Sequence, residues 1–542
     1  MSTTTSYFAL GGGLDQVSSV YAIPSGAAIE AENFEIAPGG GYARIAGFER
    51  FDGQPEPHKA AGTSGTTPAE FADSQLSAAN DRRALIQAVP GSGPVRGIVE
   101  FNGTVFAFRD AADGLSGAMY RATAGGWQLV TTPALQPGGT YKFAIWNFGG
   151  AAGLRKLYGC DGKNKALQFD GTTFTQITTG MTTDTPSLIA AHKNHLFLAF
   201  GSSLQHSAIA DPTSWTPVLG AAEIAVGDDI TNLLVSPGAS TSAALMVTTK
   251  ESVKVLYGNS SADWNLVTLS QETGAYAGSL VTVGWAFALS RRGVAGIAPD
   301  NSFANFNVTT ISERIAKYLE RFAPALRGAT VSYARNQFVL HFGSGLALSA
   351  TVGTQGVLGF MPLNYGKAFN SFWSSSKADG EDLILAGGED GFVYRLNVGT
   401  SFDGAAIPAR LWLAYANFKS PRSRKRFRKA VLEITADGYG TFASSALYDF
   451  ADPDVQPFTS YTQDEVAGFD AGGVSLSPSY QLWDATTWDQ FFFDGRPVAP
   501  VEVKLEGSGE TVSLMFASNS ALCERFTLHG VIVHYDVRRL SR

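Results

Sequence analysis

The sequence has little cysteine, little charge and no long apolar run. Cys160 and Cys523 are its only cysteines in 542 residues, so we expect neither a disulfide framework nor a cysteine-based metal site. No stretch of 18 apolar residues is present, which predicts that the chain has no membrane span. The first residues also lack the basic and apolar stretches of a signal peptide. These absences favour synthesis and folding in a reducing cytoplasm.

Charge and glycine content narrow the class of protein further. Charged residues make up 16% of the chain and the formal net charge is −8 at pH 7, so bulk charge does not indicate a nucleic-acid-binding protein. The 60 glycines follow no Gly-X-Y period and are therefore expected in turns. A chain of this length exceeds one ordinary hydrophobic core, so we expect two or three domains.

Four similar β-rich units follow one another over residues 96–267. Each ends in a small turn followed by an aromatic residue, and these aromatics are 47, 41 and 49 residues apart: Trp127, Phe174, Trp215 and Trp264. This spacing predicts a four-stranded sheet repeated around an axis, which is a β-propeller. Looser units continue to Leu396, so the pattern is compatible with six or seven blades.

The whole chain is predicted to be all-β with three parts. Residues 1–94 are expected to form an N-terminal extended arm and a helix. Residues 95–400 are assigned to the β-propeller. The longer amphipathic strand patterns of residues 401–542 predict a C-terminal β-sandwich-like domain.

Local signals predict two helices and a hairpin. Thr67 and Glu70 match a capping box at the start of a helix over 67–88. Ser312 is the candidate cap of a second helix, in which Ile315, Leu319 and Phe322 share one face. The dipeptide at 102–103, Asn-Gly, predicts a tight β-hairpin.

The sequence contains none of the common catalytic or nucleotide-binding motifs that we sought, namely G-x-S-x-G, H-E-x-x-H, the P-loop and G-x-G-x-x-G. We therefore predict no enzyme activity, no cofactor and no metal. His192 and His195 have no acidic ligand nearby in sequence, which favours a structural or surface role over metal binding. Two pairs of adjacent acids are typical of solvated turns, and a cation role stays open for them: Asp228-Asp229 and Glu389-Asp390.

One segment concentrates positive charge. Residues 419–429 hold seven basic residues and no acid: Lys419, Arg422, Arg424, Lys425, Arg426, Arg428 and Lys429. Without these seven charges the net charge of −8 would be −15. The segment is either a docking surface for phosphate or an acidic partner subunit, or an edge strand that charge protects from unwanted pairing. For the docking surface, a protein partner is favoured over nucleic acid.

Several segments resemble a family of bacteriophage structural proteins, the tail nozzle or head-to-tail proteins that stabilise packaged DNA in P22-like phages. The resemblance begins with an amino-terminal glycine-rich turn that leads to Phe-Asp-Gly, at 33–35 with 40–53, and continues in the linker and first blade, at 88–97 with 102–103 and 107–110. It also covers a blade turn at 207–215 and the carboxy-terminal segments 417–422 and 528–540. These segments touch both ends and the middle of the chain.

The resemblance implies a structural virion protein, made in the host cytoplasm and located in the tail. It implies a homo-oligomeric ring, expected to be six-fold, between portal- or adaptor-side and tail-side virion proteins. The ring would extend the DNA channel and retain the packaged genome, and DNA would pass without sequence recognition. An acidic channel wall suits this passage because carboxylates repel phosphates.

Two other functions are compatible with a propeller. One is a receptor- or glycan-binding tail-tip protein with Trp127, Trp215 and Trp264 as its exposed aromatics, although repeated blade aromatics more often belong to the core. The other is a propeller hydrolase with carboxylates around the axis, which ranks last because no catalytic motif is visible.

Overall fold

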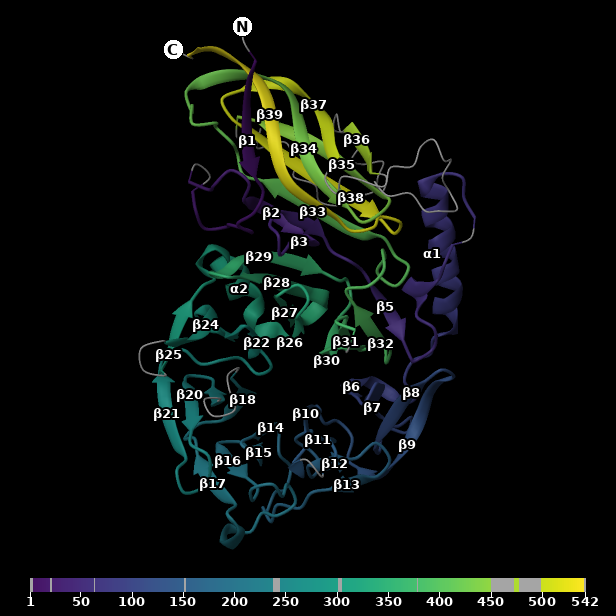
Figure 1. Ribbon diagram of the computed structural model, residues 1–542, viewed down its shortest axis with the longest axis vertical. Helices are drawn as coiled ribbons and strands as arrows, with labels where there is room; N and C mark the ends of the chain where they lie inside the picture. Colours follow the sequence, from purple (N-terminus) through teal and green to yellow (C-terminus); the bar gives the residue numbers. More distant parts are fainter. Residues whose placement is uncertain are drawn as a thin grey trace.

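The computed structural model describes residues 3–19, 22–62, 64–150, 153–236, 244–300, 305–377, 379–449, 472–476 and 499–540. A ring of β-sheets and a β-sandwich follow one another along the long axis of the molecule (Figure 1). The predicted all-β propeller with a β-sandwich is therefore confirmed. Much of the region 450–498 of the predicted C-terminal domain lies outside the described residues.

The ring begins with the four units that the aromatic spacing predicts. Each unit is one antiparallel sheet, or blade, of four consecutive strands. Blade 1 holds β6 (Ser92–Phe101), β7 (Thr104–Asp110), β8 (Gly117–Thr123) and β9 (Gly126–Leu135); blade 2 holds β10 (Lys142–Trp146), β11 (Lys156–Cys160), β12 (Leu167–Phe169) and β13 (Phe174–Gln176); blade 3 holds β14 (Leu188–His192), β15 (His195–Phe200), β16 (Ser203–His206) and β17 (Ala222–Ala225); blade 4 holds β18 (Ile230–Val235), β19 (Leu245–Thr249), β20 (Val253–Tyr257) and β21 (Asn265–Ser270).

Three further blades complete the ring, so the described residues form seven blades. Blade 5 holds β22 (Val281–Val283), β23 (Trp285–Ser290), β24 (Gly293–Asp300) and β25 (Asn305–Thr310); blade 6 holds β26 (Leu326–Ser332), β27 (Gln337–Phe342), β28 (Leu346–Gly353) and β29 (Gly356–Asn364); blade 7 holds β30 (Phe369–Ser376), β31 (Asp382–Gly388), β32 (Val393–Leu396) and β5 (Phe48–Phe51).

The last blade is completed by the amino-terminal part of the chain. Its fourth strand, β5, pairs with β32 so that Phe48 lies opposite Leu396 and Phe51 opposite Val393. Blade 7 meets blade 1 where the Ser371 hydroxyl donates to the Val95 carbonyl at 3.1 Å. Buried apolar side chains from neighbouring blades share cores around the ring, and no blade can bury its apolar faces alone.

The sandwich combines strands from both ends of the chain. One sheet has the order β3 (Phe34–Ile36), β4 (Tyr42–Arg44), β39 (Phe526–Leu540), β34 (Ser423–Ala436) and β37 (Ala499–Gly509), with β1 (Thr4–Ala9) also pairing with β39. The other has the order β2 (Ala28–Glu32), β33 (Ile407–Leu413), β38 (Val512–Ser520), β35 (Gly440–Tyr448) and β36 (Gly472–Leu476). The segment 1–94, expected as an arm with a helix, thus supplies β1 to β4 to the sandwich and β5 to the propeller.

The local signals are mostly confirmed. Helix α1 (Pro68–Leu85) has Thr67 as its N-cap, with both hydrogen bonds of the capping box to Glu70. The Asn-Gly dipeptide joins β6 to β7, and both of its residues have positive φ. The second helix, α2 (Ala316–Phe322), follows the 3₁₀ turn η4 (Glu313–Ile315). The prediction that Ser312 caps it is wrong, because its Oγ accepts from the Val294 N–H at 2.8 Å instead.

The first strands of the chain also join the propeller to the sandwich. Glu35 is buried on β3 and forms ion pairs with Arg335 of blade 6 at 3.2 Å and with Arg525 of the sandwich at 2.7 Å. Asn33 donates from Nδ2 to the Asn364 and Pro408 carbonyls. These contacts position the sandwich against the rim of blade 6.

Candidate functional site

The predicted basic segment lies at the end of the sandwich remote from the propeller. Its second half forms the start of β34, beside the C-terminal end of β39 (Figure 1). Strand alternation exposes Arg424, Arg426 and Arg428 on the outer face and buries Lys425 and Phe427. The seven basic residues are therefore not equivalent.

Lys425 is structural. Its side chain is fully buried, and its Nζ donates to the carbonyls of Ser420 at 2.8 Å, Ser423 at 3.0 Å and Glu510 at 2.7 Å. The three carbonyl oxygens accept the three N–H donors of the ammonium group. Burial lowers the pKa of Lys425. This residue anchors the turn before β34 and is not available to a partner.

Two other members of the segment are paired within the sheet. Arg428 contacts Asp536 of β39 at 2.6 Å and Lys429 contacts Glu502 of β37 at 2.6 Å. These pairs fix neighbouring strands but contribute little stability where they are exposed.

Four basic residues remain as candidates for docking: Lys419, Arg422, Arg424 and Arg426. All four are exposed, and their side chains have no ion pair within the described part of the chain. The turn that presents them has positive φ at Phe418 and Lys419. The alternative interpretation of the segment as an edge strand is wrong, because β34 pairs with β39 on one side and β37 on the other.

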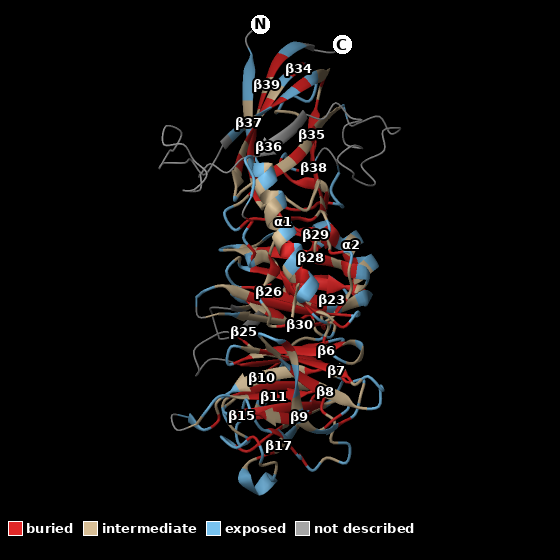
Figure 2. Cartoon of the chain, turned by 90° about the vertical axis from the view of Figure 1, so that its right-hand side faces the viewer, coloured by how far each residue is buried: buried red, intermediate tan, exposed pale blue. Residues whose placement is uncertain are grey.

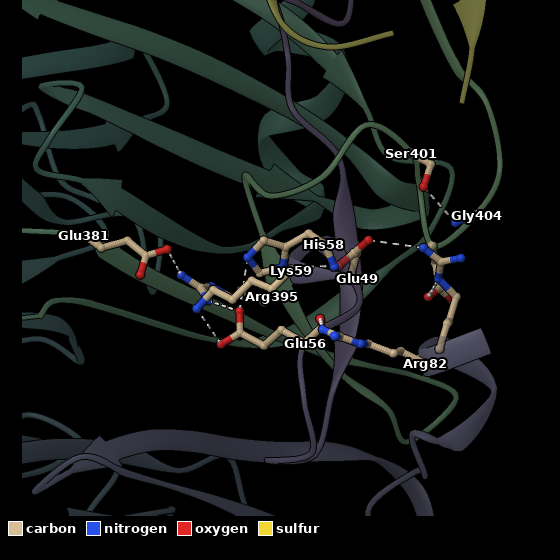
Figure 3. A network of polar contacts seen from close by, with 11 residues as sticks. Glu49, Glu56, His58, Lys59, Arg82, Glu381, Arg395, Ser401 and Gly404 are labelled. Atoms are coloured by element: carbon tan, nitrogen blue, oxygen red, sulfur yellow. Dashed lines mark hydrogen bonds and ion pairs between the residues drawn. The ribbon is translucent and has the colours of Figure 1, made fainter. Parts of the chain in front are cut away.

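A second polar cluster, which the sequence did not predict, lies beside blade 7 (Figure 3). Glu49 of β5 accepts from the His58 N–H at 2.6 Å and pairs with Arg83 of α1 at 3.1 Å. Arg395 of β32 pairs with Glu56 and with Glu381.

These side chains tie α1, the turn η1 (Pro57–Lys59) and β5 to the propeller. Asp403 joins the same cluster through Arg50 at 2.7 Å and Arg83 at 3.2 Å, and its burial raises its pKa. Partners in the cluster are up to 353 residues apart, so no local pattern could have identified them. Each acid already has a cationic partner, which indicates a structural role.

The two histidines considered as metal ligands lie in the core of blade 3. His195 shares a hydrogen bond of 2.7 Å with the Ser207 carbonyl. His206 accepts from the Trp264 indole N–H at 3.1 Å. Burial lowers the pKa of His192 to about 4, so its imidazole is neutral at pH 7. In the described part of the chain there is no group of three or more His, Cys, Asp or Glu residues suited to holding a metal ion.

The two acidic pairs are exposed turn residues. Asp228 accepts the Asp229 N–H at 2.8 Å, between blades 3 and 4. Asp390 follows Glu389 and contacts Lys367 at 2.9 Å and the Tyr394 hydroxyl at 2.7 Å. A lysine therefore already neutralises one of the four carboxylates.

The blade tryptophans are not a flat binding platform. Trp127, Trp215 and Trp264 are each half-buried and pack against the cores of their blades. Their indole N–H groups also point to protein in two cases, where Trp215 donates to the Pro212 carbonyl and Trp264 to His206. This arrangement agrees with the interpretation that the repeated blade aromatics belong to the core.

Comparisons with known proteins give a likeness of fold at low identity. No family model matches the chain, and no curated protein matches it. Among solved structures it is similar to BBS1N in complex with ARL6DN, with 8% identity and a TM-score of 0.39 over 58% of this chain and 96% of that chain. It is similar to U3-55K at 11% identity and a TM-score of 0.39, over 58% and 99%. Saccharomyces cerevisiae Sqt1 shows 10% identity and a TM-score of 0.39, over 57% and 96%. None of the helices in the described ranges has the length and apolarity needed to cross a membrane.

Proposed function

We propose that this chain is a structural subunit of a phage virion, located in the tail nozzle below the portal and adaptor. Identical subunits would form a ring, expected to be six-fold, that extends the DNA channel and retains the packaged genome. The protein would act by assembly and not as an enzyme. DNA would pass through the ring without sequence recognition.

The observation that carries the proposal is the separation of charge along the molecule. The exposed cations Arg422, Arg424 and Arg426 lie at the free end of the sandwich, while the chain as a whole has a net charge of −8. Complementary charge steers association and fixes its orientation. A basic end on an acidic subunit suits attachment to an acidic partner above the ring, with an acidic remainder that does not hold DNA.

The position of the family-like segments supports the same role. Residues 33–35 and 40–53 include most of β3 and all of β4 and β5, which join the sandwich to the propeller. Residues 417–422 form the turn of the basic end. Two of the family-like segments therefore fall on the joint between the domains and on the candidate docking surface.

The first test is the composition of purified phage particles from the source. Quantitative mass spectrometry should find this protein at a fixed ratio to the portal protein, as expected for a tail ring. Particles assembled without it should lose their DNA. Absence of the protein from particles, or full retention of the genome without it, would overturn the proposal.

The second test concerns the basic end. Arg424→Glu combined with Arg426→Glu should reduce incorporation into particles by about tenfold or more, because charge reversal replaces attraction by repulsion. Arg291→Glu is the matched control, since this exposed arginine lies on blade 5. Equal incorporation of both variants would contradict the docking role of the basic end.

A further inference from the structure

An exposed apolar tip projects from blade 3 between β16 and β17. The tip is the 3₁₀ turn η3 (Pro217–Leu219), in which Val218 is 91% exposed and Leu219 is 63% exposed. Ile209, earlier in the same connection, is 59% exposed. β17 lies at the end of the molecule opposite the sandwich (Figures 1 and 2). Single exposed apolar residues are common, whereas a projecting group of them marks an interaction site.

The connection that carries the tip is held in one conformation. Asp211 accepts from the Thr213 N–H at 3.0 Å and from its hydroxyl at 2.7 Å. Trp215 packs on the blade core and donates to the Pro212 carbonyl at 3.1 Å. Gly220 ends the turn with a φ of 95°. A preformed tip loses little conformational entropy when it binds.

The blade around the tip is acidic. No lysine or arginine occurs between Lys193 and Lys250 in the sequence. Two exposed acids lie on the tip side of the blade, Asp211 in the same connection and Glu223 near the start of β17, whereas Asp228 and Asp229 lie beyond the other end of β17, beside the turn between β15 and β16. A partner for the tip should therefore combine an apolar cavity with positive charge.

The same chain carries a groove with these properties where the propeller meets the sandwich. Two adjoining cavities of about 650 Å³ and 540 Å³ share Gln16, Ile29, Tyr318 and Phe322 in their walls. The walls come from the N-terminal loop, β2, α2 and the region of β33, where Trp412 lines the larger cavity. The volumes are typical of binding pockets, and the larger wall is mainly apolar.

Basic side chains lie at the rim of this groove. Lys317 and Arg321 are exposed on α2, and the Arg321 guanidinium lies 5.1 Å from the centre of the Phe322 ring. The acids of the groove are already paired. Glu30 and Glu32 both contact Arg410, at 2.9 and 3.2 Å.

Asp15 is the remaining acid of the groove. Its carboxylate accepts from the N–H groups of Val17 and Ser18 and lies 3.7 Å from Arg314. Every acid in the cavity walls therefore has partners within the chain, and the exposed cations of these walls are Lys317 and Arg321.

We propose that the apolar tip of one copy docks into this groove of a second copy. Val218 and Leu219 would enter the aromatic cavity, and the acids of blade 3 would face Lys317 and Arg321. The contact is heterologous, because tip and groove lie on different parts of the chain, and a heterologous contact can repeat to form a ring. The inference rests on the proposed role as a repeating subunit and names the contact that repeats.

The test uses sedimentation analysis of the full chain and two exposed-site variants. The tip variant carries Val218→Asp and Leu219→Asp, and the groove variant carries Lys317→Glu and Arg321→Glu. Each should weaken self-association by about tenfold or more. Leu115→Asp is the matched control, since Leu115 is 78% exposed on blade 1 and should leave self-association unchanged.

Mixing the two variants gives the decisive result. The tip variant keeps its groove and the groove variant keeps its tip, so an equimolar mixture should form one-to-one dimers that grow no further. Misfolded variants could not form such dimers, so dimer formation would show that both variants are folded. Restored association should also follow when Glu223→Arg is added to the groove variant.

Three outcomes would overturn the contact: a wild-type chain that stays monomeric, a tip variant that associates like wild type, or no dimer in the mixture. These failures are distinct from failure of the proposed function. The protein could be found in particles while the tip and groove do not pair, or pair in solution while particles lack it.

Discussion

The propeller and the sandwich of this chain are built from strands with different connectivity. In blades 1 to 6 each strand pairs with the next strand along the chain, whereas β39 of the sandwich pairs with β1, β4 and β34. The propeller therefore consists mainly of local contacts, and the sandwich of contacts between distant segments. Blade 7 is the exception, because β5 completes it from the amino-terminal region. Pairing of distant segments costs more loop-closure entropy than local pairing, and this cost grows slowly with loop length.

The largest expected effect is at the strand that completes the ring. The Phe48 ring is buried and meets Phe402, Tyr394 and Phe369 at centroid distances of 5.0, 5.4 and 5.8 Å. Phe48→Ala should lower the free energy of unfolding by about 3–5 kcal/mol, because it leaves a cavity in this cluster. Denaturant unfolding measures this change.

Phe174→Ala supplies the comparison for Phe48. Phe174 is also buried but lies in blade 2, which has only consecutive strands. Phe174→Ala should lower the free energy of unfolding by less than Phe48→Ala does. An equal or larger loss would show that the distant strand is not anchored more strongly than an ordinary blade strand.

The next largest change in stability is expected at Lys425 of the sandwich and not at its neighbour Arg426. Lys425→Met should lower the free energy of unfolding by about 2–3 kcal/mol, because three carbonyl oxygens lose their donor in a buried site. Arg426→Met is the control and should change it by less than about 0.5 kcal/mol, since Arg426 is exposed. Thermal or urea unfolding of both variants measures the difference in stability. Similar losses of stability would contradict the structural role of Lys425.

Acidification should weaken the propeller. Burial lowers the pKa of His192 to about 4 and that of His341 to about 3. In the unfolded chain these histidines bind protons near pH 6.5, so stability is complete above that pH and falls as pH decreases toward the folded pKa values. Between pH 7 and pH 5 each histidine should cost about 2 kcal/mol of stability.

Unfolding free energies measured across this pH range test the prediction. His192→Gln and His341→Gln should each make the dependence on pH shallower. Hydrogen exchange at pH 5 should show blades 3 and 6 opening before the sandwich. Unchanged pH dependence in both variants would exclude these histidines as its origin.

The smallest effect is expected outside both domain cores. Thr67→Ala removes the capping box of α1 and should cost about 1 kcal/mol, because one N–H of the first turn loses its acceptor. Amide exchange of that turn should accelerate. Ser77→Ala, at an exposed position in the middle of the same helix, should not destabilise it. If both variants behave alike, the cap does not stabilise the helix.

The basic segment shows how far sequence reasoning reached for the candidate site. Charge alone identified Lys419 to Lys429 but treated seven residues as one surface. Strand alternation in β34 separates exposed Arg424 and Arg426 from buried Lys425. The partners of Arg428 and Lys429 lie on β39 and β37, so only strand pairing could reveal them.

Local sequence patterns were enough to predict the repeated blade units, the capped helix and the Asn-Gly hairpin. These features depend on hydrogen bonds and packing between residues close together along the chain. The completion of the seventh blade, the shared sandwich and the groove beside α2 could be seen only in the folded chain. Each of these depends on pairing between segments far apart in sequence, such as β5 with β32 and β1 with β39, which local patterns do not encode.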